Sequence, residues 1–142
     1  MFLNYQGSII AALLGLGLAA YFANRILSIE VTDSKVQSLS DAIRKGSMAF
    51  LKRQYSWVSI FVVILAVLIS TLTDWGYPYG AIAFIGGALF SSLAGFIGMR
   101  IATAANGRTT EAARDGGTLK ALPVAFRGGA VMGFSVAGLG LL

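Results

Sequence analysis

The basic residues of this chain fall into two groups, and their distribution restricts the possible folds more than any other feature. Four apolar stretches alternate with polar ones, and all eleven Lys and Arg residues lie either between the first and second stretches or between the third and fourth. Segments 1–7 and 74–78 contain none. Lys and Arg in short loops stay on the cytoplasmic side of a membrane during insertion. The pattern therefore predicts four spans with both long loops inside and the N-terminus outside.

The composition supports a membrane protein. Hydrophobic residues make up 56% of the chain and charged residues 12%, whereas a soluble domain averages about 25% charged residues. Topology accounts for the net charge of +5, so we do not expect nucleic acid as a partner. The chain has no Cys and no His, which excludes disulfides, thiolate chemistry and the commonest zinc ligands. We predict an all-α, polytopic transmembrane helix bundle and reject a soluble bundle.

The apolar stretches and their flanks give the expected elements. These are transmembrane spans at about residues 8–26, 57–73, 79–102 and 123–142, a cytosolic amphipathic helix at 33–54 and a cytosolic loop at 103–121. A cleaved signal peptide is a rival interpretation of the first stretch, but no basic residue precedes that stretch. An outer aromatic belt is expected from Trp75, Tyr77 and Tyr79, beside a tight reversal at Gly76 and Pro78.

Small residues recur every four positions in three of the spans, which predicts close helix packing. They are Ala11, Gly15, Ala19 and Ala23; Ala83, Gly87, Ser91 and Gly95; and Gly129, Gly133 and Ala137. The last span reaches Leu142 without a polar flank, so we expect a truncated chain that lacks downstream helices.

The two inner loops carry local helix signals. Ser34 and Gln37 have capping-box spacing, and Asp33 adds negative charge at that helix start. Glu111 and Arg114 have the spacing of an i, i+3 ion pair, and Gly116–Gly117 is expected to end their helix. The basic second loop could also attract a phosphorylated substrate, although topology explains the same charges.

No catalytic chemistry can be assembled from the residues themselves. The charge-free centres of the four spans contain no Asp, Glu, Lys, Arg or His, although ion pathways depend on such groups. A Mg²⁺–phosphate site needs a denser carboxylate cluster than Asp33 and Asp41 provide. The sequence therefore predicts no catalytic residue, no cofactor-binding residue and no metal ligand.

Three segments nevertheless resemble one known family, the membrane-integral pyrophosphatases. Segment 41–55, DAIRKGSMAFLKRQY, is similar to the region before that family's second helix. Segments 92–114 and 125–142 are similar to its third and fourth helices. Gly107 stands where Val is common in the family, which leaves the length of the third helix open, because Gly weakens a helix by up to about 1 kcal/mol.

The resemblance implies a homodimeric pump in a bacterial or archaeal cell membrane. Such a pump hydrolyses cytosolic pyrophosphate as its Mg²⁺ complex and moves H⁺ or Na⁺ outward, with K⁺ dependence possible. The family's acidic motifs and Mg²⁺ ligands map onto no position here. The chain is then an N-terminal, non-catalytic part of the pump. The alternative is a complete small four-helix membrane protein that acts as an assembly or interaction subunit.

Overall fold

The computed structural model describes residues 2–72 and 79–142, and its regular structure there is entirely helical. Helix α1 spans Phe2–Leu27, α2 spans Ser34–Leu72 and α3 spans Tyr79–Leu141. Each is long and apolar enough to cross a membrane. The expected helical membrane architecture is confirmed. The expected count of four spans is not, because these helices number three and the regions expected as the third and fourth spans both lie within α3.

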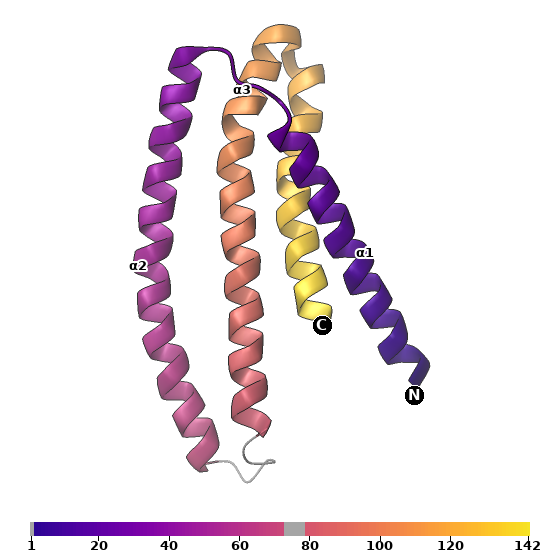
Figure 1. Cartoon of the computed structure of the whole chain (residues 1–142), viewed down its shortest axis with the longest axis vertical. Coiled ribbons are helices and arrows are strands. Elements are labelled where there is room, and N and C mark those ends of the chain that lie inside the picture. Colours follow the sequence, from indigo (N-terminus) through magenta and orange to yellow (C-terminus); the bar gives the residue numbers. More distant parts are fainter. Residues whose placement is uncertain (1, 73–78) are drawn as a thin grey trace.

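Helix α3 folds back on itself. Its 63 residues would measure about 95 Å if straight, more than three times a hydrocarbon thickness of about 30 Å. Gly116 and Gly117 have non-helical backbone angles, and the chain reverses there (Figure 1). Gly117 has a φ of 65°, which side chains rarely tolerate. We call residues 79–115 the first arm and 118–141 the second arm.

The break at Gly116 and Gly117 confirms the expected helix end. It also corrects the expected loop at 103–121, which is helical everywhere except at these two residues. The second arm begins before Pro123, which had been expected near the start of the fourth span. Pro123 lies inside the helix, beyond the first turn of the second arm, so its missing N–H leaves the Leu119 carbonyl without its helical partner.

Helix α2 joins two predicted elements. The amphipathic segment at 33–54 and the span at 57–73 form one continuous helix that ends at Leu72. Its 39 residues measure about 58 Å, so α2 is much longer than one membrane crossing. Some expectations lie outside the described residues: position 73, the aromatic-belt residues Trp75 and Tyr77, and the reversal at Gly76 and Pro78.

Helix α3 is the centre of the molecule (Figure 1). In the described part of the chain α1 and α2 each pack on α3 and do not pack on one another. The core lies where α1 meets both arms and consists of Ala19, Ile26, Ile101, Ala105 and Val131. Beside it the Phe22 and Phe134 rings stack with their centroids 6.2 Å apart.

The buried residues follow a seven-residue repeat. In α1 they are Ala12, Ala19 and Ile26, and in the second arm they are Val124, Gly128, Val131, Ser135 and Gly138. Spacings that alternate between three and four keep one face turned toward a neighbour when helices cross at small left-handed angles. The contact surface between α1 and the second arm, which we call the apolar seam, therefore has a coiled-coil character.

This repeat corrects the predicted small-residue ridge of the last span. A Cβ added to Gly129 or Gly133 meets no atom within 4 Å, so these glycines do not mark a close approach. A Cβ on Gly138 would lie 2.8 Å from Leu16 Cγ and 3.0 Å from the Ala12 carbonyl oxygen. Residues spaced by four shift gradually around a helix of 3.6 residues per turn and leave the face that meets the neighbouring helix. Residues spaced alternately by three and four stay on that face.

Candidate functional site

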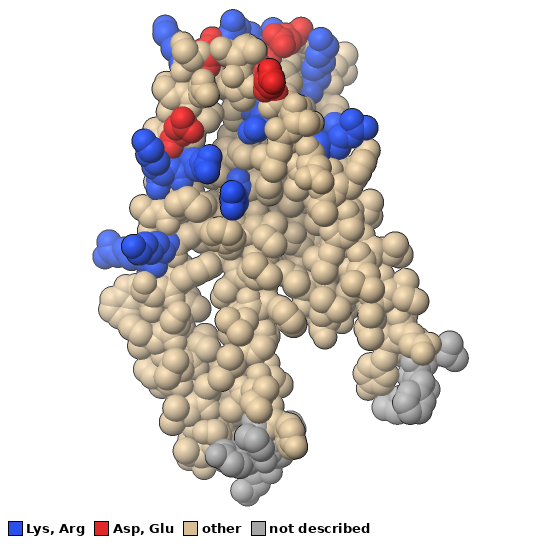
Figure 2. Space-filling view, in the orientation of Figure 1, with Lys and Arg blue, Asp and Glu red and all other residues tan. Residues whose placement is uncertain are grey.

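Charged side chains gather at one end of the molecule (Figure 2). This end carries the α1–α2 connection and the reversal of α3 (Figure 1). Both basic groups lie there, as their distribution along the sequence predicted. We call residues 27–45 and 104–120 the charged cap. The cap contains the polar contacts between distant segments that follow, so it is the candidate site.

Arg108 fixes the end of α1 to the first arm. Its Nε donates to the Ile29 carbonyl at 2.9 Å, and its Nη2 donates to the Leu27 carbonyl at 3.4 Å. Its Nη1 donates to the Ala104 carbonyl of its own helix at 2.8 Å. The last carbonyls of a helix lack helical partners, and a cation complements their partial negative charge. Arg108 therefore caps α1 from a residue about 80 positions away.

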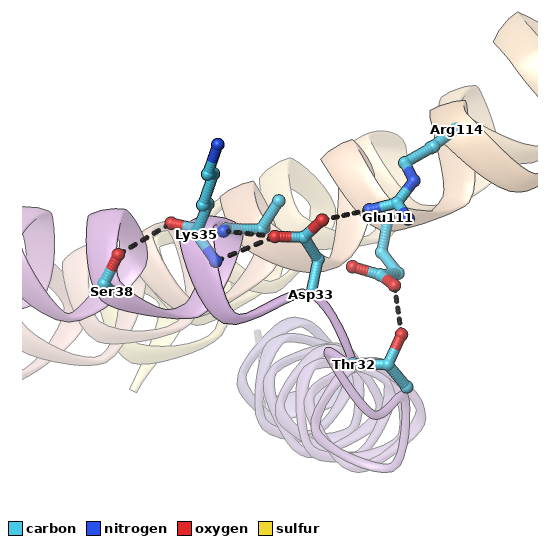
Figure 3. A network of polar contacts seen from close by, with 7 residues as sticks. Thr32, Asp33, Lys35, Ser38, Glu111 and Arg114 are labelled. Carbon is cyan, nitrogen blue, oxygen red and sulfur yellow. Dashed lines mark hydrogen bonds and ion pairs between the residues drawn. The ribbon is translucent and has the colours of Figure 1, made fainter.

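Asp33 caps the start of α2. Its Oδ1 accepts from the backbone amides of Lys35 at 2.8 Å and Val36 at 3.1 Å. Its Oδ2 forms an ion pair with Arg114 (Figure 3). The Val36 and Lys35 amides, followed by Arg114, lower the pKa of Asp33. The predicted capping box at Ser34 and Gln37 was therefore misplaced by one residue, because Ser34 is already helical.

Glu111 is a buried carboxylate beside this ion pair. It is 7% exposed, and its Oε1 accepts a hydrogen bond from Thr32 (Figure 3). Its Oε2 has no hydrogen-bond partner among the described residues. The predicted Glu111–Arg114 pair was wrong, because the α1–α2 connection lies against the first arm and supplies a different partner to each side chain: Thr32 to Glu111 and Asp33 to Arg114.

Gly107 allows α2 and the first arm to meet closely. It is buried, and a Cβ at this position would overlap Ser40 Oγ. The Ser40 hydroxyl in turn donates to the Val36 carbonyl at 2.7 Å. The helix continues through Gly107 without a break, so the expected loosening of the helix end does not occur. This glycine gives space to Ser40.

Tyr55 makes a further contact between α2 and the first arm. Its hydroxyl donates to the Ser92 carbonyl at 2.6 Å, and a Cβ on Gly95 would lie 3.0 Å from that hydroxyl oxygen. Amphipathic rings such as those of Tyr55 and Trp57, which precede the second span, favour the headgroup level of a membrane. Trp57 is exposed, but Tyr55 is half-buried against α3. The sequence offered no sign of this contact beyond the presence of a tyrosine in an apolar region.

The described charged cap offers contacts that order helices, and no assembled catalytic group. Asp33 is engaged by Arg114 and two amides, and Glu111 by Thr32. Within residues 2–72 and 79–142, no group of three or more Asp, Glu, His or Cys side chains could hold a metal ion. Mg²⁺ in proteins is held by carboxylates together with several waters or phosphate oxygens. These two engaged carboxylates do not fit a Mg²⁺ site.

The chain is similar to known ion pumps over nearly its whole length. A family profile described as inorganic H⁺ pyrophosphatase matches residues 13–142. A K⁺-insensitive pyrophosphate-energized proton pump of Methanosarcina mazei is 45% identical over 94% of the chain and 20% of the relative. Proton pump 2 of Moorella thermoacetica, also K⁺-insensitive, is 44% identical over 92% of the chain and 19% of the relative. A putative K⁺-stimulated sodium pump of Clostridium tetani is 42% identical over 89% of the chain and 18% of the relative.

The chain therefore belongs to the inorganic H⁺ pyrophosphatase family, as its motifs suggested. With this membership and its apolar helices, it is an integral membrane protein. The chain spans about a fifth of the length of the relatives that it matches.

Proposed function

We propose that the chain is the helical scaffold part of a pump that couples hydrolysis of cytosolic pyrophosphate to outward transport of H⁺ or Na⁺. The observation that carries this proposal is the family match over residues 13–142. Relatives of similar identity are named as proton pumps and as sodium pumps, so the match supports both ions.

The chain contributes structure to the pump and leaves catalysis to the regions that it does not cover. Its buried carboxylate and its one described ion pair tie helices together at the charged cap. The Mg²⁺ that the resemblance implies is held elsewhere, because the described carboxylates do not form a ligand cluster. Stimulation by K⁺, which one relative's name records, also depends on other regions. The pump is a homodimer. Many apolar side chains of α2 are exposed, and they are covered partly by lipid and partly by further helices of the pump.

The chain crosses the membrane four times, because each arm of α3 makes its own crossing. The second arm has 24 residues and would measure about 36 Å, which is enough for one hydrocarbon layer. The charged cap lies in the cytosol, and both ends of the chain lie on the other side, where basic residues are absent.

Thiol labelling tests this topology directly, since the chain has no native cysteine. A cysteine placed at Lys45 or Arg114 should react with an impermeant reagent only in inside-out vesicles. A cysteine at Tyr79 should react only in intact cells. Labelling of Lys45 or Arg114 from the exterior would overturn the orientation.

Substitution of Arg100 and Arg127, which flank the apolar stretches of the two arms, tests the scaffold role in the full-length pump. Arg100→Ala and Arg127→Ala should lower the amount of folded protein in the membrane and leave the KM for pyrophosphate within about twofold, a change of less than about 0.5 kcal/mol. Pyrophosphate hydrolysis and ion uptake into vesicles are the measurements. A large rise in KM with normal membrane yield would contradict a purely structural role.

A further inference from the structure

A second polar feature of the charged cap is a cavity that the contacts described above do not fill. Its volume is about 380 Å³, within the range of small-molecule sites, roughly 300–1,000 Å³. It lies where α1 ends and faces the start of α2. Its charged lining residues are Arg44, Arg108, Glu30 and Asp41.

The four charges balance, and they do not pair with one another. The ion pair that the described residues form is Arg114–Asp33, which lies outside this cavity, and none joins Arg44 or Arg108 to Glu30 or Asp41. Asp41 and Arg44 are three residues apart on α2, a spacing at which helical ion pairs readily form. The cavity therefore presents two cations and two anions to whatever enters it.

The two arginines are suited to different tasks. The Arg108 guanidinium is held by three backbone carbonyls, which fixes its position while it keeps its charge. Arg44 is exposed, so its guanidinium is free to turn toward a ligand. Guanidinium groups bind phosphate through paired N–H donors.

Apolar side chains line the same cavity. Leu27, Ile29 and Val31 come from the end of α1 and the connection that follows it. These apolar side chains lie on the α1 side of the cavity, whereas Asp41 and Arg44 come from α2. Leu27 is the last residue of an apolar helix, so in the proposed topology the cavity lies on the cytosolic side of the hydrocarbon, at the level of the headgroups.

We propose that this cavity binds the headgroup of an inner-leaflet phospholipid that carries both a phosphate and a primary amine, the chemistry of phosphatidylethanolamine. The phosphate lies toward Arg44 and Arg108, and the ammonium lies toward Glu30 and Asp41. The proposal concerns a lipid site separate from pyrophosphate hydrolysis, and it requires only that the charged cap face the cytosolic leaflet.

The test uses the delipidated full-length protein, titrated with single lipids and observed by native mass spectrometry. Phosphatidylethanolamine should bind more tightly than phosphatidylcholine, whose quaternary amine has no N–H donor, and than phosphatidylglycerol, which has no amine. Arg44→Gln should weaken phosphatidylethanolamine binding about tenfold, the usual effect of losing one charge-assisted hydrogen bond. Arg53→Gln, on the same helix and outside the cavity lining, is the matched control and should have no effect.

Two further arms distinguish the sources of this chemistry. Glu30→Gln combined with Asp41→Asn should remove the preference over phosphatidylglycerol while the protein stays folded. Soluble phosphoethanolamine should compete poorly, because the apolar wall favours a lipid; competition at an equal concentration would overturn the assignment to a lipid. Equal binding of the three lipids to the unaltered protein, or equal losses in Arg44→Gln and Arg53→Gln, would overturn the site itself.

Discussion

The apolar seam and the charged cap hold the same helices by different means. In the seam, α1 meets the second arm through glycines, and Gly15 and Gly138 bring two backbones together. In the cap, long polar side chains reach across from α3, and Arg108 and Arg114 bind the α1–α2 connection. Burial of apolar side chains does not drive helices together in lipid, so close van der Waals contact between helices has to do so. Where water is available, charge and hydrogen-bond geometry can select partners that are far apart in sequence.

The largest effect is expected from filling the seam. Gly138→Val places a side chain against the Ala12 carbonyl, which cannot move without displacing α1. Overpacking of this kind costs about 3 kcal/mol at its upper range. We expect a matching loss of stability when the detergent-purified full-length protein is unfolded with increasing SDS. Gly133→Val is the control, since a Cβ there has open space; equal losses in both variants would mean that the seam is not a close contact.

The next effect is expected in the cap, at its buried carboxylate. Glu111→Ala removes the acceptor of the Thr32 hydroxyl and leaves a cavity, at a cost of about 2 kcal/mol. Asp115→Ala, four residues further along and exposed, should change stability by less than about 0.5 kcal/mol. The same SDS unfolding measurement applies. If Glu111→Ala were as mild as its control, polar contacts would not order the cap.

The reversal between the arms should be less sensitive. Gly117→Ala forces a side chain into a backbone conformation, φ 65° and ψ −159°, that is essentially confined to glycine, and should cost at least about 1 kcal/mol. Gly116 has an extended φ of −167°, and an added methyl group there meets only the flexible Lys120 side chain. Gly116→Ala should therefore be nearly neutral. A larger loss of stability in Gly116→Ala than in Gly117→Ala would contradict the assignment of the strained backbone to Gly117.

The smallest effect is expected from Asp33, whose side chain is 25% exposed, and it should depend on pH. Its folded pKa lies below the ordinary value of 3.8, so the unfolded chain takes up the proton first as pH falls. The stabilisation is therefore complete above about pH 4 and is lost as pH falls through the lower folded value. Melting temperatures of the unaltered protein and Asp33→Asn should converge below pH 3.8. A constant difference across that range would exclude the carboxylate as the cause.

The sequence was sufficient for features that depend on neighbouring residues. Hydropathy predicted helices in the membrane, the amphipathic segment at 33–54 predicted a helix before the second span, and Gly116–Gly117 predicted a helix end. It was insufficient for contacts that depend on the fold. Nothing near Glu111 indicates that Thr32, 79 positions earlier, lies beside it. The four-residue spacing predicted that Gly129 and Gly133 would lie on the contact face of the last span, whereas the close approach to α1 is at Gly138.

The candidate site was predictable mainly in its location. The clustering of basic residues indicated which end would carry polar contacts. The identity of each partner was not predictable, because Arg114 has carboxylates available both on its own helix and on the connection. Arg114 pairs with Asp33 in the structure, because two backbone amides at the start of α2 hold that carboxylate within its reach.

The length of α2 has a mechanical consequence. From Ser34 to Leu72 the helix contains no proline and no non-helical residue, so it has no built-in hinge. About half of its length extends beyond a single hydrocarbon thickness, and that part packs closely against the first arm at Gly107. In the proposed topology, a displacement of the cytosolic part of α2 is therefore carried along one unbroken helix into the part that crosses the membrane.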